Sequence, residues 1–509
     1  MPRDHRNHSM TSHELSAHHQ LADGFLMRRR FGNFIDGQEQ APRSAAWLPV
    51  VDPATGMHIA DAPDSDAADV DAAVAAAPRA FTQSAWSQLR PADREQMLYR
   101  LSQLIEEHGD ELSAIETLQS GKLRSVARAV DVGGGAEFVR YMAGWATKLE
   151  GQTLQPSIGF PPGVQYHTWT RREAVGVVAA VVPWNFPLAI ALWKVAPALA
   201  AGCTVVLKPS PETPLTALRL AELALAAGIP PGVLNVVCGA GPTGAALTSH
   251  PGVDKISFTG STQTGKAIGH AAIENMARVT LELGGKSPLI VLEDCDVDRA
   301  AMGAAMGIFF NQGQVCTAGS RVYVQRRIFD RVVTAMAQIA EGMKIGSGFD
   351  PETQVGPVVS SRHFERVMGY LDRARAEGAR VLTGGERSGT AGCFIQPTVL
   401  VDVHAGMQVV REEVFGPVVS AMPFDDVDEV VRLANDSPYG LAASVWSNDL
   451  SAVHRLIPRL QAGTVWVNCH NMLDNNLPLG GYKQSGVGRD LGRAAVEGCT
   501  ELKSVCMAV

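Results

Sequence analysis

The 509-residue chain has no apolar run long enough to cross a membrane and no excess of basic residues. Its most apolar stretch, residues 174–187, is interrupted by Pro183 and Asn185, whereas a membrane span needs about 18 apolar residues. The 44 Lys and Arg are outnumbered by 52 Asp and Glu, which gives a net charge of −8. We therefore expect neither a membrane protein nor one whose main task is nucleic-acid binding.

The eight cysteines show no CxxC pair and no spacing typical of a metal site, so we predict no metal centre. Unpaired thiols in a chain of this size indicate a reducing setting, and we expect a cytoplasmic protein. Residues 1–23 hold five histidines and no apolar segment of the kind found in signal peptides. We interpret them as a disordered tail.

Strand-like and helix-like segments alternate through much of the chain, which is too long for a single core. An Asp36-Gly37 hairpin and a helix capped at Ser65 or Asp66 come first. Buried strands are expected at 175–182, 203–210, 232–239, 255–260 and 277–285, with helices at 187–199 and 215–228 between them. This pattern predicts an α/β fold with a parallel, doubly wound sheet, which binds ligands beyond the carboxyl ends of its strands. A second alternation, from 321 to 468, predicts a second α/β domain.

One thiol and one carboxylate stand out because of their surroundings. Cys316 lies in FNQGQVCTAGS, a segment of small and amide-bearing residues that suits a loop better than a core strand. Glu282 ends a predicted strand 34 residues earlier (316 − 282 = 34). We interpret Cys316 as a covalent nucleophile and Glu282 as the base that activates water. The alternative for a cysteine considered alone, a buried structural thiol, is the more common case.

Polar residues at other strand ends suggest an oxyanion donor and a nucleotide site. Asn185 follows a strand between two aromatic residues and could donate to an oxyanion. Lys208 could contact ribose hydroxyls or a phosphate. The segment GSTQTG (260–265) follows a strand and opens a helix, as phosphate-binding turns do, although a turn without a ligand is at least as common. Glu413 is followed closely by Phe415, an aromatic suited to a flat ring such as nicotinamide.

Seven motifs together carry a family resemblance. They are PWNFP (183–187), KPSPETP (208–214), FTGSTQTG (258–265), LELGGKSP (281–288), GQVC (313–316), EEVFGPV (412–418) and LPLGGYKQSGVGRD (477–490). From about residue 25 to the C-terminus the chain resembles the aldehyde dehydrogenase superfamily, and as a set these motifs are highly specific.

The resemblance implies three structural parts after the tail. A Rossmann-like NAD-binding domain would comprise residues 24–152 and 173–284, and a catalytic domain residues 285–482. A small oligomerisation element would combine residues 153–172 and 483–509. Family members form homodimers or homotetramers, so a homo-oligomer is expected here.

The resemblance also implies catalytic roles. Cys316 would attack the aldehyde, and Asn185 with the Cys316 backbone N–H would hold the oxyanion. Hydride transfer to nicotinamide would leave a thioester, hydrolysed by water that Glu282 activates. Lys194 and Asp490 match a pair that passes the proton to solvent, although many relatives have Glu in place of Asp490.

The same resemblance implies a cofactor site for NAD. Lys208 and Glu413 would bind ribose hydroxyls, Ser261 the pyrophosphate, and Trp184 and Phe415 would flank the cofactor. The remaining cofactor positions are Val182, Pro183, Ser210, Pro211, Glu212, Gly241, Phe258, Gly260, Gly265 and Leu283. NAD-preferring relatives often have Glu where Pro211 stands. Glu212 follows and adds negative charge, so we favour NAD without excluding NADP.

The expected substrate pocket is apolar. Its members are Phe186, Ala189, Ile190, Trp193, Val315, Thr317 and Leu479. Several segments look most like family members that oxidise phenylacetaldehyde, and an apolar pocket suits an arylacetaldehyde. Other aldehydes stay open, among them aliphatic aldehydes and betaine aldehyde, although a cationic aldehyde would want an aromatic cage that Trp193 alone does not make.

Two further alternatives concern the chemistry itself. A CoA-acylating relative would pass the acyl group to CoA rather than water, but such relatives typically lack a glutamate at the position of Glu282. A non-catalytic descendant of the fold should have lost Cys316, Glu282 or Asn185, and all three are present.

Overall fold

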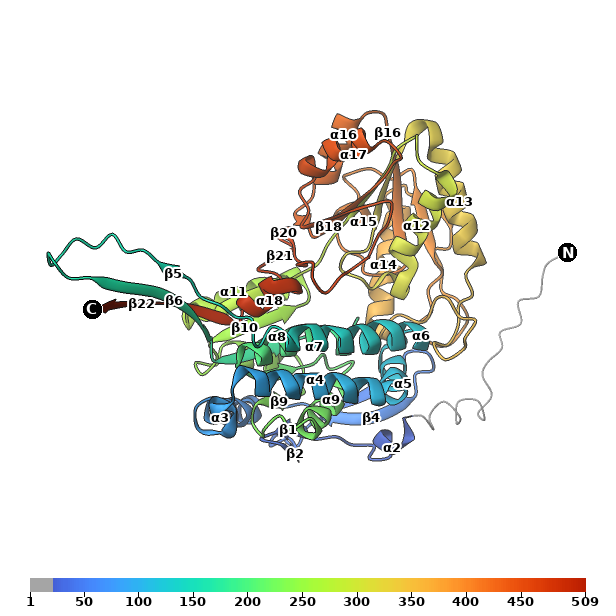
Figure 1. The fold of residues 1–509 in the computed structure, drawn as a ribbon. Helices are drawn as coiled ribbons and strands as arrows, with labels where there is room; N and C mark the ends of the chain where they lie inside the picture. Colours follow the sequence, from blue (N-terminus) through green and yellow to red (C-terminus); the bar gives the residue numbers. More distant parts are fainter. Residues whose placement is uncertain (1–21) are drawn as a thin grey trace.

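The computed structural model describes residues 22–509 and consists of two stacked α/β units with a projecting arm (Figure 1). The predicted tail, residues 1–23, lies outside the described residues except for its last two positions. Within the described residues, no helix is both long and apolar enough to span a bilayer.

The first unit is an eight-stranded sheet in the order β2-β1-β9-β8-β7-β10-β11-β21. The five strands from β9 to β11 run parallel, and β1 and β21 pair antiparallel to them. The strands are β1 (Asn33–Ile35), β2 (Gln38–Gln40), β7 (Val177–Val181), β8 (Thr204–Lys208), β9 (Leu234–Val236), β10 (Lys255–Thr259), β11 (Arg278–Glu282) and β21 (Gly486–Val487). The expected parallel α/β sheet is confirmed.

Helices cover both faces of this sheet, as a doubly wound fold requires. One face carries α3 (Ala67–Gln83), α10 (Gly241–Thr248) and α11 (Thr262–Glu274). The other carries α8 (Pro187–Ala201) and α9 (Leu215–Ala226), with α4 (Pro91–Glu107), α5 (Gly109–Ser120) and α7 (Gly135–Ala143) packed outside them. Shorter helical segments are α2 (Asp23–Leu26), η1 (Ala85–Gln88), α6 (Arg124–Val126) and the π-helix η2 (Ala127–Gly134).

The second unit is a seven-stranded sheet in the order β14-β15-β16-β13-β12-β18-β19, parallel except for β14. Its strands are β12 (Pro288–Val291), β13 (Arg321–Gln325), β14 (Arg380–Thr383), β15 (Thr398–Val401), β16 (Val418–Phe424), β18 (Ala442–Trp446) and β19 (Thr464–Val467). Its helical segments are α12 (Val297–Phe309), η3 (Phe310–Gly313), η4 (Arg326–Ile328), α13 (Phe329–Gly342), α14 (Ser361–Ala376), α15 (Gln408–Arg411), α16 (Val427–Asn435), α17 (Leu450–Leu456) and η5 (Ile457–Arg459). One buried apolar cluster includes strands of both sheets, so the two units share a core.

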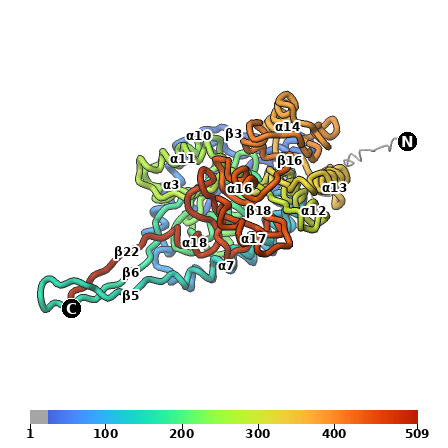
Figure 2. The backbone as a smooth tube through the Cα atoms, turned by 90° about the horizontal axis from the view of Figure 1, so that it is seen from above, coloured from blue at the N-terminus to red at the C-terminus, as the bar shows by residue number. Residues whose placement is uncertain are grey.

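The arm is a three-stranded sheet in the order β22-β6-β5. Its strands are β5 (Thr153–Leu154), β6 (Tyr166–Ala174) and β22 (Thr500–Ala508), and Figures 1 and 2 show it extending away from the body. The segment 483–509 therefore divides: β22 joins the arm, whereas β21 pairs with β11 of the first sheet and α18 (Gly492–Glu497) packs on α8. The remaining strands form two hairpin-like pairs, β3 (Trp47–Val51) with β4 (His58–Pro63) and β17 (Tyr439–Gly440) with β20 (Tyr482–Lys483).

Local sequence signals explain several element boundaries. Asp36 and Gly37 both have positive φ, 54° and 77°, as the tight hairpin between β1 and β2 requires. Asp66 caps α3 and forms a reciprocal capping box with Asp69. The strand expected at 232–239 is shorter, β9, because Gly232 and Gly239 have positive φ and turn the chain at each end.

Candidate active site

Cys316 lies on a sharp turn between η3 and β13. The three residues Asn311, Gln312 and Gly313 all have positive φ, 48°, 57° and 71°. For two non-glycine residues this is a strained conformation, and such strain concentrates at functional sites. A side chain at Gly313 would meet the Gly416 carbonyl oxygen at 2.0 Å, so only glycine fits beside that segment.

Asn185 is tied directly to this turn. It follows β7, and its Nδ2 donates to the Gln314 carbonyl oxygen at 2.9 Å. Asn311 Nδ2 donates in return to the Asn185 carbonyl oxygen at 3.0 Å. Because an amide NH2 carries two hydrogens, Asn185 keeps a second donor for a ligand. Asn185, from the first sheet, and the turn that carries Cys316, from the second sheet, therefore lie at one place.

The protein environment disfavours the charged form of Cys316. Burial raises the pKa of its thiol to about 12, and the carboxyl groups of Glu413 and Glu282 add to that rise. The segment after Glu282 passes against the same backbone, since a side chain at Gly285 would lie 2.4 Å from the Cys316 carbonyl oxygen. The thiol needs a base or a nearby positive charge to become a nucleophile.

Glu282 ends β11 and is almost fully buried. Burial, and then the carboxylate of Asp490, raise its pKa well above the usual range. Its Oε1 has no hydrogen-bond partner among the described residues. Gly480 leaves room for it, because a side chain there would approach Oε1 to 2.7 Å. A buried carboxyl with a free oxygen, close enough to Cys316 to affect the pKa of its thiol, is suited to proton transfer.

Lys194 and Asp490 form a buried ion pair close to Glu282. Lys194 Nζ lies 2.5 Å from Asp490 Oδ2. Asp490 is brought there by two backbone hydrogen bonds with Leu479, each 2.8 Å, and by β21 pairing with Glu282 through Gly486. The predicted pair is thus next to the predicted base, as its expected role requires.

Aromatic side chains line the predicted nicotinamide side of the site. Trp184 and Phe415 meet edge to face with ring centroids 5.3 Å apart. His363 packs on both rings, and its Nε2 lies 2.7 Å from the Phe415 carbonyl oxygen. Glu413 Oε1 accepts from the Gly285 N–H at 2.9 Å, and burial raises the pKa of Glu413 to about 7. Nothing in the pattern around His363 predicted its place here.

The predicted ribose side holds one buried ammonium and one neutralised carboxylate. Burial lowers the pKa of Lys208 to about 8, and its Nζ donates to the Pro209 carbonyl oxygen at 3.0 Å. Glu212 accepts from Ser210 Oγ at 2.5 Å and pairs with Arg362 Nη2 at 2.8 Å. Arg362, which sequence reasoning missed, is well exposed and comes from the other sheet's α14.

Two helix N-termini face the same region. Gly241 begins α10, and no atom lies within 4 Å of a side chain built there. Ser261 caps α11 by accepting from Thr264 N–H at 3.2 Å. Two of the other predicted positions pack on glycines of these turns: Phe258 lies under Gly260, and Leu283 packs against Gly265. The Val182 N–H donates to the Lys208 carbonyl oxygen. Pro183 and Pro211 are half-buried in their loops.

Four predicted substrate residues lie in α8 or at its N-cap. Phe186, Ala189, Ile190 and Trp193 recur at helical spacing. Phe186 stacks on Phe310, with centroids 6.3 Å apart, and Phe310 was not assigned from the sequence although it precedes the loop of amides. The other predicted members are buried: Val315 lines a small cavity with Glu413 and Phe415, Thr317 follows the nucleophile, and Leu479 pairs with Asp490.

Known proteins match this arrangement over nearly the whole chain. The Aldehyde dehydrogenase family model matches residues 40–505. The chain belongs to the aldehyde dehydrogenase family. The phenylacetaldehyde dehydrogenase of Pseudomonas fluorescens is 52% identical, covering 93% of this chain and 95% of the relative, and a betaine aldehyde dehydrogenase of Cereibacter sphaeroides is 45% identical, covering 93% and 96%.

Solved aldehyde dehydrogenases confirm the fold and the cofactor. An NAD+ complex from Bacillus cereus superimposes with a TM-score of 0.93 at 45% identity, covering 96% of this chain and 98% of that one. The indole-3-acetaldehyde dehydrogenase of P. syringae, in complex with NAD+ and IAA, gives 0.91 at 43%, covering 94% and 96%. This aldehyde dehydrogenase is thus an NAD-dependent oxidoreductase that acts on aldehydes.

The residues of this aldehyde dehydrogenase fit NAD. Lys208 Nζ makes a single hydrogen bond within the described residues and has donors to spare for ribose hydroxyls. The space around the Gly241 Cα at the start of α10 is open, and the N-terminus of α11 is capped. Both places suit a pyrophosphate, since helix N-termini favour anions.

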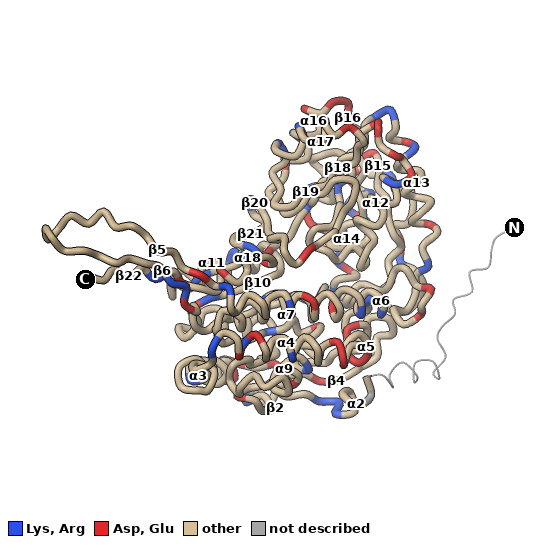
Figure 3. The backbone as a smooth tube through the Cα atoms, viewed as in Figure 1, with Lys and Arg blue, Asp and Glu red and all other residues tan. Residues whose placement is uncertain are grey.

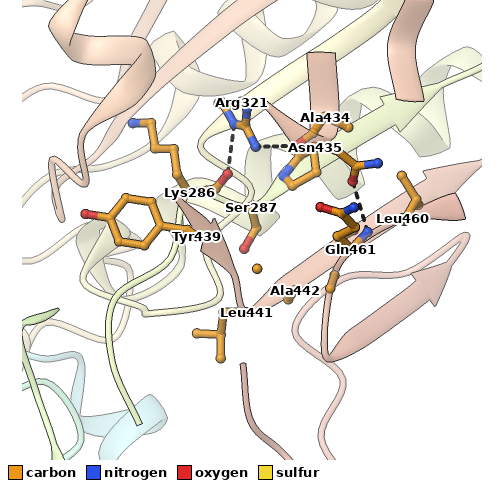
Figure 4. Close-up of a pocket in the computed structure, with 14 residues that line it drawn as sticks. Lys286, Ser287, Arg321, Ala434, Asn435, Tyr439, Leu441, Ala442, Leu460 and Gln461 are labelled. Atoms are coloured by element: carbon orange, nitrogen blue, oxygen red, sulfur yellow. Dashed lines mark hydrogen bonds between the residues drawn. The ribbon is translucent and has the colours of Figure 1, made fainter. Parts of the chain in front are cut away.

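A second small cavity, shown in Figure 4, lies away from these residues. It is lined by the start of β12 and β18 and by Arg321, whose guanidinium donates to the carbonyl oxygens of Lys286 and Ala434 at 2.8 Å each. Its volume of about 10 Å³ leaves room for about one water molecule, so it is too small for an aldehyde.

Proposed function

We propose that this enzyme oxidises an apolar aryl aldehyde, with phenylacetaldehyde as the best candidate, to its carboxylic acid. The observation that carries this proposal is the meeting of Cys316, Asn185 and Glu282 beside a wall of apolar side chains. The balanced reaction takes aldehyde, NAD+ and water to acid, NADH and a proton.

In the proposed first step, Cys316 Sγ forms a bond to the aldehyde carbon and gives a thiohemiacetal. The free Asn185 hydrogen and the Cys316 backbone N–H would stabilise the developing oxyanion. Because burial raises the pKa of the thiol, proton removal must accompany attack, and Glu282 in its carboxylate form is a stronger base than an ordinary carboxylate. NAD, when bound beside Cys316, would supply the hydride acceptor for the thiohemiacetal carbon.

In the proposed second step, Glu282, having first released the thiol proton, removes a proton from water, which attacks the thioester carbon; the C–S bond breaks, and the proton returns to Cys316 Sγ as the acid leaves. The unpartnered Oε1 supports this role. Lys194 and Asp490 would carry the released thiol proton away from the buried carboxyl, since they form the ion pair whose charges act on it. The presence of Glu282 favours water over CoA as the acyl acceptor.

Several observations favour an arylacetaldehyde over a cationic aldehyde. Lys122 Nζ lies 4.2 Å from the centroid of Phe186, so one ring face is already used by a buried ammonium. A cationic substrate would therefore find only a partial aromatic cage. The relatives named for phenylacetaldehyde and indole-3-acetaldehyde, at 52% and 43% identity, support the same substrate class. Betaine aldehyde is the second candidate, because relatives at 45% identity carry that name.

Initial rates with a panel of aldehydes test this proposal. Phenylacetaldehyde, benzaldehyde, acetaldehyde and betaine aldehyde would each be assayed with NAD and with NADP. We expect the highest kcat/KM for phenylacetaldehyde with NAD. A clear preference for betaine aldehyde would refute the substrate class and leave the roles of Cys316 and Glu282 standing.

The arm supports a homo-oligomer. Its outer part, residues 154–165, contains no charged residue (Figure 3) and exposes Leu154, Ile158, Phe160 and Val164. Ion pairs such as Arg172–Glu497, 3.4 Å, hold its base to the body. Exposed apolar side chains on an extended sheet are suited to a second copy. We therefore assign residues 153–172 and β22 to oligomerisation, the first sheet to NAD and the second to catalysis.

The eight cysteines are all unpaired, and four of them are buried. Free thiols persist in a reducing compartment, so a cytoplasmic location is part of the proposal.

A further inference from the structure

The turn that carries Cys316, residues 314–320 and here called the nucleophile turn, receives little support from its own backbone. Within it, Ala318 N–H donates to the Val315 carbonyl oxygen at 3.0 Å, and Gly319 N–H reaches back to Gly307 at 3.0 Å. Cys316 and Thr317 therefore depend on contacts from elsewhere for their position. Asn185 holds the turn at Gln314, and the side-chain contacts to Thr317 come from the segment after β19.

His470 contacts the residue that follows the nucleophile. Its Nε2 lies 2.9 Å from the Thr317 carbonyl oxygen, and its Nδ1 lies 3.0 Å from Ser444 Oγ. A carbonyl oxygen only accepts, so Nε2 carries the hydrogen and Nδ1 accepts from the Ser444 hydroxyl. Burial lowers the pKa of His470 to about 4, so the ring stays neutral and keeps this tautomer at neutral pH.

The imidazole is enclosed in a slot built for its shape. Side chains at Gly307 and Gly319 would approach the ring to 3.2 and 3.4 Å, and Trp466 lies against it with centroids 4.8 Å apart. The slot joins α12, the nucleophile turn and β19, so the ring fixes their separation.

Asn471 provides a second contact with the same residue. Thr317 Oγ1 donates to Asn471 Oδ1 at 2.7 Å, and Asn471 Nδ2 donates to the Gly307 carbonyl oxygen at 3.4 Å. Asn471 has a φ of 58°, a left-handed conformation that asparagine tolerates better than most residues. Thr317 is thus held at its backbone oxygen and at its hydroxyl.

We propose that His470, together with Asn471, is a positioning residue that aims the Cys316 thiol through Thr317. This inference rests on the proposed function, in which Cys316 is the nucleophile. Displacement of a reacting group by about 1 Å costs up to about 10²-fold in rate, so loss of the His470 contact should lower kcat. The NAD side is built from other residues, so the KM for NAD should stay unchanged.

The test compares His470→Phe, which keeps a flat ring without hydrogen bonds, with His470→Gln, whose amide can donate to Thr317 and accept from Ser444. Each is measured for kcat, for KM of NAD, and for the rate at which iodoacetamide labels Cys316, read by peptide mass. We expect His470→Phe to lower kcat by about 10- to 100-fold and to change the labelling rate by about fivefold or more, with His470→Gln within about threefold of the parent. Exposed His454→Phe is the matched control and should change nothing.

A folded His470→Phe enzyme with parental kcat and labelling would overturn the proposal, as would His470→Gln as damaged as His470→Phe. Should His470→Phe fail to fold, Ser444→Ala decides, because it removes only the hydrogen bond that orients the ring: a smaller loss in the same direction supports the proposal and no loss overturns it. The labelling rate reports the position of the Cys316 thiol and does not depend on turnover. Retained turnover in Cys316→Ala would refute the proposed function, but it would not bear on the labelling result for His470.

Discussion

The two sheets contribute to the site from opposite edges. In the first sheet, Asn185, Lys208 and Glu282 stand at the carboxyl ends of β7, β8 and β11. In the second sheet, Cys316 and Glu413 come before the amino ends of β13 and β16. The site therefore forms where a carboxyl edge faces an amino edge. Parallel sheets generally bind ligands beyond the carboxyl ends of their strands. The first sheet follows this rule, whereas the second contributes from the amino ends of its strands.

The difference divides the proposed chemistry as well. In the proposed mechanism the first sheet would provide most of the cofactor contacts and the base, and the second would provide the nucleophile and two side chains that meet the cofactor. If the division is correct, changes in the second sheet's turn should stop chemistry and spare NAD binding. Changes at the nucleotide residues should alter cofactor affinity first.

The largest effect is expected for Cys316→Ala. Without the thiol no covalent intermediate forms, so kcat should fall by about 10⁴-fold or more. NADH formation at 340 nm measures the loss, and quenching of tryptophan fluorescence by NAD should persist. The matched control is Cys295→Ala, a half-buried thiol of the second unit, which should keep its activity. A Cys316→Ala enzyme that kept more than about one per cent of the parental kcat would contradict the nucleophile assignment.

Glu282→Gln should have the next largest effect, because it tests the first sheet's part in chemistry. Loss of a general base costs about 10²- to 10⁴-fold, so steady-state kcat should fall in that range. If Glu282 acts mainly on water, a rapid burst of NADH should survive before the slow hydrolysis of the thioester. Rapid-mixing absorbance distinguishes the two phases, with exposed Glu274→Gln as the control. A missing burst would mean that the slowest step without Glu282 is removal of the thiol proton, before hydride transfer, rather than activation of water.

The sequence predicted the first sheet better than the second. Strand–helix alternation identifies parallel strands, and the edge rule then predicts that Asn185, Lys208, Ser261 and Glu282 lie close together. No comparable rule predicts which residues precede β13 and β16 at the same place. Cys316 and Glu413 are expected at the site from their local surroundings and from the family motifs, not from the topology of the second sheet.

The residues that sequence reasoning missed act through long-range contacts. His363 reaches the site from α14 by a bond to a backbone oxygen, and His470 does the same from the loop after β19. Neither lies in a pattern that marks function, because a lone histidine is more often an ordinary core residue. Their roles depend on which backbone oxygens the fold brings within reach.

A smaller effect is expected in the pH dependence of NAD binding. Glu413 has a pKa raised to about 7, so it gains a proton as the pH falls through 7 and then accepts hydrogen bonds from ribose less well. Since the ionised fraction falls about tenfold between pH 8 and 6, the KM for NAD should rise by up to about tenfold over that range. Glu413→Gln should flatten the profile at the higher KM. The exposed neighbour variant Glu412→Gln should keep the parental slope, and a parental slope in Glu413→Gln would refute the assignment.

The smallest effect concerns the choice between NAD and NADP, where the two sheets meet at Glu212 and Arg362. The guanidinium neutralises the carboxylate that would repel a 2′-phosphate, but the pair is exposed on the arginine side and therefore weak. Glu212→Gln should raise kcat/KM for NADP by about three- to tenfold and leave the value for NAD within about twofold, because only NADP carries the extra charge. Arg362→Gln should lower the NADP value by a similar factor. In the double variant Glu212→Gln, Arg362→Gln both effects on kcat/KM for NADP should largely cancel. A kcat/KM for NADP that still rises in the double variant would show that Arg362 does not contact the phosphate. The first sheet alone would then set the preference.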